Sequence, residues 1–240
     1  MASRIARLIP PVLLAGALAG CSGIKEVPYD HGGSAPVKTI GLLPPAMSTK
    51  RPAVVLASTV GNSFGLVGAL VNGAMRSARE DRMEALFTAQ HYDVNAEFEN
   101  DLQATLEAHG YKVVRVAATR QKTDFLEQYP SAAGTEIDAY LDVADVQYGF
   151  LSAGMGSSNP YRPTIDFKCK LVRASDKSLL MQEEIAYNPL NAKDGKVTLP
   201  PDPAYAFVDD DTLNADPPKT REAFDTALRQ STDAVGNLLR

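Results

Sequence analysis

The chain has 240 residues, with 24 basic and 29 acidic side chains, a formal net charge of −5 and only two cysteines. The acidic balance, without a basic run of five residues, argues against a nucleic-acid partner. The length suffices for one sizeable hydrophobic core, and two cysteines are too few for a disulfide framework.

The first twenty residues predict a bacterial lipoprotein signal peptide. Two arginines precede an uncharged apolar run over residues 8–19, which is too short to remain as a membrane-spanning helix. The run ends in Leu18-Ala19-Gly20-Cys21, which resembles the lipobox of bacterial lipoproteins. The resemblance implies cleavage after residue 20 and lipidation of Cys21, including acylation of its amine. An ordinary secretory signal with a chance cysteine is the alternative.

Two features near Cys21 predict where the mature protein would be held. Ser22 resembles the pattern of lipoproteins that are exported to the outer membrane, so the resemblance implies an anchor facing the periplasm. Residues 21–36, rich in glycine, serine and proline after the cysteine, predict a flexible tether with a reach of about 20 Å. A single domain over residues 37–240 would follow.

The first part of this domain contains an uncharged stretch over residues 53–75, after a strand predicted at 37–43. Apolar residues recur at helical spacing from Phe64, so we expect one helix over about 64–89, packed closely on the sheet or at a subunit contact. A membrane-spanning helix and a flexible or membrane-touching loop are the alternatives. Gly61 and Gly65 would allow close helix contact if the segment spanned a membrane.

The remaining pattern predicts an α+β fold. We expect helices and strands at the following positions: a helix at 98–108, a strand at 111–116, a short helix around 125–129, strands at 139–153, 162–173 and 178–187, and a helix at 219–239. Residues 188–218, rich in proline and aspartate, predict a long loop. The order β-α-α-β-β-β-β-α predicts a mixed sheet of about five strands with helices packed on it.

Cys169 is predicted to be buried. Ile165, Phe167, Cys169 and Leu171 alternate with charged residues, which places the cysteine on the apolar face of a strand. With Cys21 taken by lipid, Cys169 has no partner for a disulfide within the chain, and we expect an inert thiol.

The sequence offers no strong catalytic, metal or cofactor site. It lacks a nucleophile elbow, a phosphate loop and metal-ligand spacing among its three histidines. The glycine-rich segment 154–158 predicts a turn. Three aspartates around the strand at 139–153 are the only acid/base candidates: Asp138, Asp142 and Asp145. Calcium binding by the aspartates of the long loop (Asp202, Asp209, Asp210, Asp211 and Asp216) is an alternative to a solvated acidic loop.

The pattern over residues 37–240 resembles a group of periplasmic lipoprotein domains. The residues that carry the likeness are 37–45, 110–114, 139–143 and the strand pair ending at Tyr187. The group includes the curli secretion lipoprotein, the Pel polysaccharide lipoprotein, the activator of penicillin-binding proteins and the N-terminal domain of the Tol propeller protein. Uncharacterised proteobacterial lipoproteins with the same glycine-rich segment are more similar still. The resemblance implies an α+β domain and offers no catalytic residues.

These observations favour a non-enzymatic protein anchored to the outer membrane through Cys21, which binds an envelope protein or polymer. The second hypothesis is a subunit of an oligomeric secretion or export assembly that uses residues 53–75 for subunit or membrane contact, with a homo-oligomer as one form. The third and least favoured is an envelope hydrolase that uses Asp138, Asp142 or Asp145.

Overall fold

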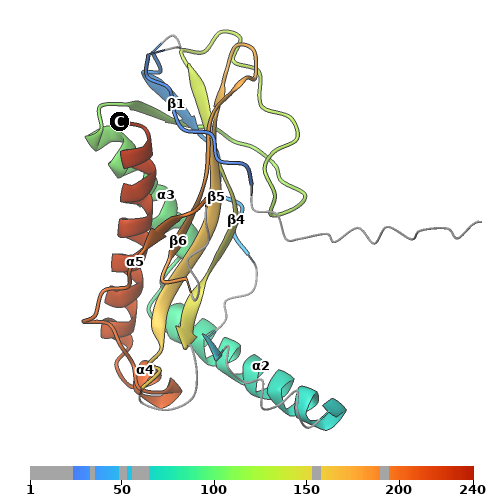
Figure 1. Ribbon diagram of the computed structural model, residues 1–240, viewed down its shortest axis with the longest axis vertical. Helices are drawn as coiled ribbons and strands as arrows, with labels where there is room; N and C mark the ends of the chain where they lie inside the picture. Colours follow the sequence, from blue (N-terminus) through green and yellow to red (C-terminus); the bar gives the residue numbers. More distant parts are fainter. Residues whose placement is uncertain (1–23, 33–35, 49–52, 56–64, 153–157, 190–194) are drawn as a thin grey trace, which may run out of the picture.

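The computed structural model describes residues 24–32, 36–48, 53–55, 65–152, 158–189 and 195–240. One mixed sheet with helices packed on it confirms the predicted α+β class (Figure 1). The signal peptide, Cys21 and most of the predicted glycine turn lie outside the described residues.

Seven strands of the described residues form a single sheet. Their bounds are β1 (Thr39–Leu42), β2 (Ala53–Val55), β3 (Lys112–Arg115), β4 (Ala139–Ser152), β5 (Arg162–Arg173), β6 (Leu179–Tyr187) and β7 (Val197–Leu199). The order is β3-β1-β4-β5-β6-β7, and β2 pairs with the far end of β4. The central strands β4, β5 and β6 are antiparallel, whereas the other pairings are parallel. The prediction missed β2 and β7, because three residues are too few to show a two-residue period.

Helices α3 and α5 lie side by side across one face of the sheet (Figure 1). The helices of the described chain are α2 (Gly65–Ala89), α3 (Val94–Ala108), α4 (Asp210–Ala215) and α5 (Pro217–Leu238). Helix α3 begins earlier than predicted, because the Asp93 side chain accepts the amides of Asn95 and Ala96 as an N-cap. It ends as predicted at His109 and Gly110, where the glycine takes a φ of +88°.

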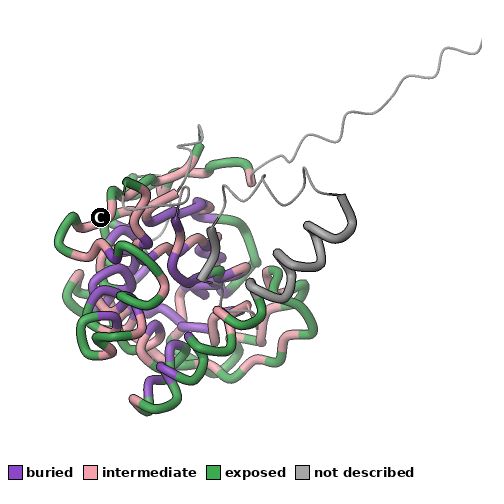
Figure 2. The backbone as a smooth tube through the Cα atoms, turned by 90° about the horizontal axis from the view of Figure 1, so that it is seen from below, coloured by how far each residue is buried: buried purple, intermediate pink, exposed green. Residues whose placement is uncertain are grey.

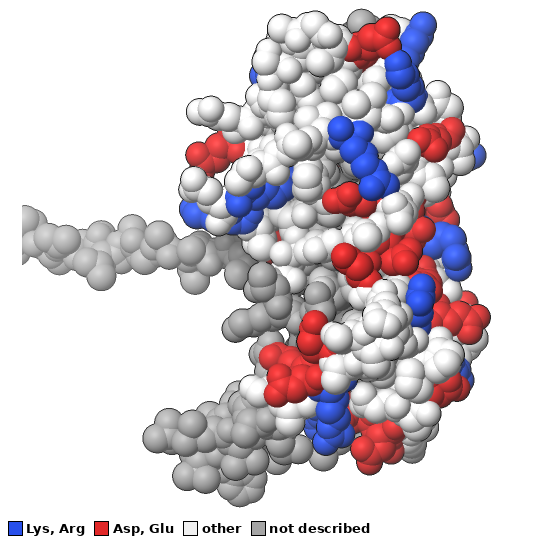
Figure 3. All heavy atoms as spheres, turned by 180° about the vertical axis from the view of Figure 1, so that it is seen from behind, with Lys and Arg blue, Asp and Glu red and all other residues white. Residues whose placement is uncertain are grey.

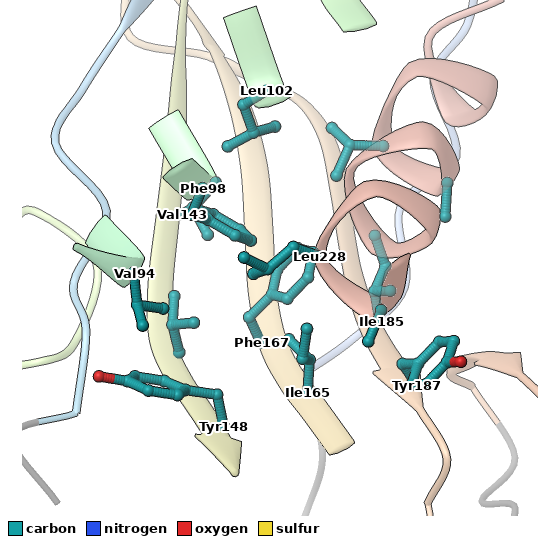
Figure 4. Close-up of a cluster of buried hydrophobic side chains, with 14 of the residues drawn as sticks. Val94, Phe98, Leu102, Val143, Tyr148, Ile165, Phe167, Ile185, Tyr187 and Leu228 are labelled. Atoms are coloured by element: carbon teal, nitrogen blue, oxygen red, sulfur yellow. The ribbon is translucent and has the colours of Figure 1, made fainter. Parts of the chain in front are cut away.

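The main core lies between the sheet and these helices, as the buried interior in Figure 2 shows. Alternate residues of β5 point at the helices, and Phe98 of α3 meets Phe167 edge to face, with 5.3 Å between the ring centroids (Figure 4). Cys169 is fully buried on this face, which confirms its predicted position.

Residues 117–138 cover part of the opposite face of the sheet. Tyr129 of this segment stacks on Tyr140 of β4, with 5.9 Å between the centroids, and Leu126 and Ile137 pack on the same small cluster. The prediction of a helix around 125–129 is wrong, because these residues, all of them described, are irregular. The shape of the segment comes from tertiary contacts with β4 rather than from helical hydrogen bonds.

The uncharged stretch 53–75 is divided between a strand and a helix. Its first three residues form β2, and α2 begins at Gly65, close to the predicted start. The second half of α2 joins the core through Met83 and Phe87. Within the described residues, no helix combines the length and apolar character that crossing a membrane requires. Residues 56–64 lie outside the description.

The segment 188–218 is more ordered than a simple loop. It contains β7 and α4, which the prediction missed. Asp209 caps α4 by accepting the amide of Thr212 at 2.7 Å, and Asp216 caps α5 by accepting the amide of Lys219 at 3.2 Å. Two aspartates of this segment therefore serve as helix N-caps, a position at which aspartate is strongly preferred.

Candidate functional site on the second face of the sheet

The three predicted acid/base candidates are held by three different sets of partners. The carboxylate of Asp138 accepts the backbone amides of Lys38 and Thr39 at 2.8 and 2.9 Å, which attaches the start of β1 to the start of β4. Asp142 binds residues of the segment 117–138, and Asp145 binds Lys168. The structure therefore does not direct these carboxylates toward a shared partner.

Asp142 is fully buried and has a partner on each carboxylate oxygen. One oxygen accepts from the Arg120 guanidinium at 2.6 Å, and the other accepts from the Leu126 amide at 2.9 Å and the Tyr129 hydroxyl at 2.7 Å. Arg120 also donates to the carbonyl oxygens of Pro44 and Asp124. A buried ion pair whose remaining hydrogen-bonding groups are satisfied is typical of a structural clamp.

Lys170 of β5 lies beside this clamp. Its ammonium group is 4.3 Å from the ring centroid of Phe125 and 5.3 Å from that of Tyr129. Burial lowers the pKa of Lys170, the nearby Asp142 charge raises it, and Arg120 lowers it further. The faces of the two aromatic rings stabilise the ammonium cation.

Asp145 occupies an irregularity in β4, where the pairing with β5 shifts between Ala144 and Gln147. Its φ is +53°, a conformation that aspartate tolerates better than most residues. Such a bulge changes the direction of a side chain. The Asp145 carboxylate accepts from Lys168 of β5 at 2.9 Å, and this hydrogen bond raises the pKa of Lys168.

A second charged group on this face joins β5, β6 and the start of β7. The Lys196 ammonium contacts the carboxylates of both Asp166 and Glu184, the former at 3.1 Å. Burial raises the pKa of Asp166 and opposes the lowering effect of Lys196. Burial lowers the pKa of Lys196, but hydrogen bonds to the two carboxylates outweigh it, so the net shift is upward.

We call these five side chains the charged strip: Asp145, Asp166, Lys168, Glu184 and Lys196. Lys168 lies opposite Glu184 in the register of β5 and β6, so the two ion-pair groups are neighbours. Each charge in the strip has an opposite charge as its partner. Among the described residues, no three histidine, cysteine or carboxylate side chains group to hold a metal ion. The arrangement can bind polar groups and stiffen the sheet, and it presents no base aimed at a nucleophile.

The sequence pattern identified only part of this strip. The alternation of β5 places Asp166 and Lys168 opposite the core face, but the sequence does not single out Glu184 and Lys196 of the strip, nor Arg120 of the neighbouring clamp. Two adjacent acids inside the largely apolar strand 179–187 are a usable signal for Glu184. No local signal marked Arg120, since its partner lies 22 residues away.

Each aspartate considered as a calcium ligand has another partner, although Oδ1 of Asp210 is buried without a hydrogen-bond partner among the described residues. In the segment 188–218, Asp202 accepts the amide of Ala204 at 2.9 Å, and Asp210 pairs with Arg82 at 2.7 Å. His31 packs against the Tyr29 ring, and His109 is the C-cap of α3. Figure 3 shows acidic and basic side chains interspersed on the face seen from behind.

The comparisons with known proteins give no family. The chain matches no family model. It also matches no curated protein. Among solved structures, a DUF330 protein from Xanthomonas campestris is similar at 19% identity and a TM-score of 0.34; the match covers 62% of each chain, so this chain spans less than two thirds of that protein.

Two structures of PelC dodecamers from Paraburkholderia phytofirmans are also similar. The first, a variant of PelC with one substitution, has 8% identity and a TM-score of 0.38, over 91% of this chain and 99% of PelC. The second has 10% identity and a TM-score of 0.36, over 90% and 94%. These neighbours come from proteobacteria. With TM-scores this low, the likenesses carry no conclusion about the activity or assembly of this chain.

Proposed function

We propose that this chain is a non-enzymatic lipoprotein, anchored through Cys21 to the periplasmic face of the outer membrane, which binds an envelope protein or polymer. The observation that carries the proposal is the sequence Leu18-Ala19-Gly20-Cys21 after a short apolar run. The geometry supports the non-enzymatic part, because Asp138, Asp142 and Asp145 each have a structural partner.

The anchor is tested by Cys21→Ser in the full-length precursor. The variant should remain uncleaved, incorporate no labelled palmitate and lose the lipid-dependent membrane retention of the mature protein. Cys169→Ser is the matched control, since it removes the other cysteine and should leave lipidation unchanged. Processing and membrane fractionation of Cys21→Ser like those of the wild type would contradict the proposal.

The outer-membrane assignment rests on Ser22 and has its own test. Ser22→Asp should retain the lipidated protein in the inner membrane, whereas Ser22→Thr should not. Separation of the two membranes by density, followed by detection of the protein, distinguishes these outcomes. If Ser22→Asp leaves the distribution unchanged, the residue after the cysteine does not direct sorting here.

A second candidate function is a subunit of an oligomeric export assembly. The observation that favours it is the first part of α2. Residues 65–75 carry no charged side chain, and the N-terminal end of the helix extends away from the sheet (Figure 1). Light scattering on the detergent-solubilised lipoprotein measures the mass. A monomer that also yields no subunit cross-links in cells would exclude this alternative.

A further inference from the structure

The segment just after the proposed lipid anchor is attached to the sheet. Val27 and Gln182 of β6 exchange two backbone hydrogen bonds of 2.8 Å, and the Gln182 side-chain amide also donates to the carbonyl oxygen of Lys25. Residues 21–36 are predicted to form a flexible tether, and within this segment the structure attaches Lys25 and Val27 to β6. Backbone pairing to a free strand edge does not require a hydrophobic pattern in the sequence.

The same segment is also fixed by side-chain packing. Tyr29 is partly buried against the main core. Farther along the chain, Val37 is buried, and the Lys38 carbonyl accepts the amide of Lys112, the first residue of β3, at 2.8 Å. Attachments therefore exist both at β6 and beside β3, near opposite edges of the sheet.

The direction of the pairing determines where the chain leaves the domain. The bridge between Val27 and Gln182 is antiparallel, so residues before Val27 run toward Ile185. Ile185 is where β7 begins to pair, opposite Val197. Going back along the chain toward Cys21, the described residues therefore leave the domain at the β6–β7 edge of the sheet.

Only three residue steps separate Cys21 from Ile24, the first described residue. Three extended residues span at most about 11 Å. We propose that the lipid anchor holds the β6–β7 edge of the sheet next to the membrane surface, with the β3 edge directed away from it. This inference rests on the proposed lipidation of Cys21.

The two edges are far enough apart to be distinguished. Five strand intervals separate β7 from β3, which corresponds to about 24 Å at the usual strand spacing. Thr198 on β7 and Lys112 on β3 are both exposed and suitable for labelling. Cys169→Ala provides the background, so that each variant carries a single thiol besides the lipidated one.

The experiment uses the lipidated protein, reconstituted in vesicles of phosphatidylethanolamine and phosphatidylglycerol that contain a lipid with a nitroxide headgroup. A fluorophore is attached at Thr198→Cys or at Lys112→Cys. We expect the nitroxide to quench the Thr198 label several-fold more strongly than the Lys112 label. Equal quenching in protein that floats with the vesicles would overturn the orientation while leaving the anchor intact.

Two further outcomes separate this inference from the proposed function. Protein that does not float with the vesicles would overturn both the anchor and the orientation. Val27→Pro removes the amide that pairs with Gln182, so it should keep flotation but reduce the difference between the two labels. Val27→Thr keeps the amide and a branched side chain, and it should behave like the parent. An undiminished difference in Val27→Pro would overturn the role of this pairing.

Discussion

The Arg120 guanidinium lies 2.6 Å from the Asp142 carboxylate and joins the irregular segment 117–138 to the first part of β4. Asp142 is fully buried and Arg120 nearly so. We predict that Arg120→Met lowers the free energy of unfolding by about 3–5 kcal/mol, because it leaves a buried carboxylate without its counter-charge. Urea denaturation of the lipid-free chain measures this.

A double variant is the control for this pair. Arg120→Met combined with Asp142→Leu should destabilise less than Arg120→Met alone, since it removes both charges. Additive losses would show that the two residues act independently, contrary to the clamp.

Glu183 and Glu184 are neighbours in β6, and their side chains lie on opposite faces of the sheet. Glu183 pairs in register with Cys169, and burial raises the pKa of its carboxyl. The folded chain thus holds this proton more tightly than the unfolded chain. The protonated Glu183 carboxyl therefore contributes to folding stability. This contribution is fully present below the ordinary glutamate pKa of about 4.3 and is lost as the pH rises through the folded-state pKa. We expect Glu183→Gln to raise the melting temperature at neutral pH and to have little effect near pH 4.

Glu184→Gln is the matched comparison for Glu183→Gln. Glu184 lies on the other face and contacts Lys196, so its replacement should lower the melting temperature at neutral pH. Melting curves of both variants across this pH range test the assignment. A destabilising effect of Glu183→Gln at neutral pH would contradict the burial argument.

Cys169 should be unreactive in the folded protein. Its thiol is completely buried, and burial raises its pKa, so little thiolate forms. In a Cys21→Ser background, a thiol reagent should label Cys169 slowly under native conditions and rapidly in denaturant. Cys169→Ala should cost about 1 kcal/mol of stability through lost burial. Rapid labelling of the native chain would mean that this strand face is accessible.

Gly236 allows α5 to approach α3 closely. A Cβ at this position would lie 2.5 Å from the Thr105 methyl group and 2.7 Å from the His109 ring. Alanine normally favours a helix over glycine by about 1 kcal/mol, but overpacking costs about 1–3 kcal/mol. Because the threonine methyl cannot rotate away freely, we expect Gly236→Ala to destabilise the protein.

The Gly236 prediction has a rescue test. Thr105→Ser removes the methyl group but keeps the hydroxyl that donates to Asp233 at 3.1 Å. In this background Gly236→Ala should cost less in chemical denaturation than it does in the wild type. The same cost in both backgrounds would show that the Thr105 methyl is not the obstacle.

The long elements could be predicted because their burial has a period. The alternation of β5 placed Cys169 and Phe167 on the core face, and helical spacing identified α2, α3 and α5. The three-residue strands β2 and β7 lack enough residues to show such a period. The glycine-rich composition of residues 22–36 predicted a tether, yet Val27 pairs through backbone groups that every residue type except proline can supply.

The sequence by itself determined the α+β class, the main core face and the lipobox motif, because each depends on the spacing or identity of nearby residues. Only the tertiary structure decided which residues pair with the buried charged groups and with the segment after the lipobox. The partners of Arg120, Lys196 and Val27 lie 22, 12 and 155 positions away along the chain. Contacts between residues so far apart in the sequence form only when the fold brings their segments together. The local sequence therefore has no periodic pattern that identifies them.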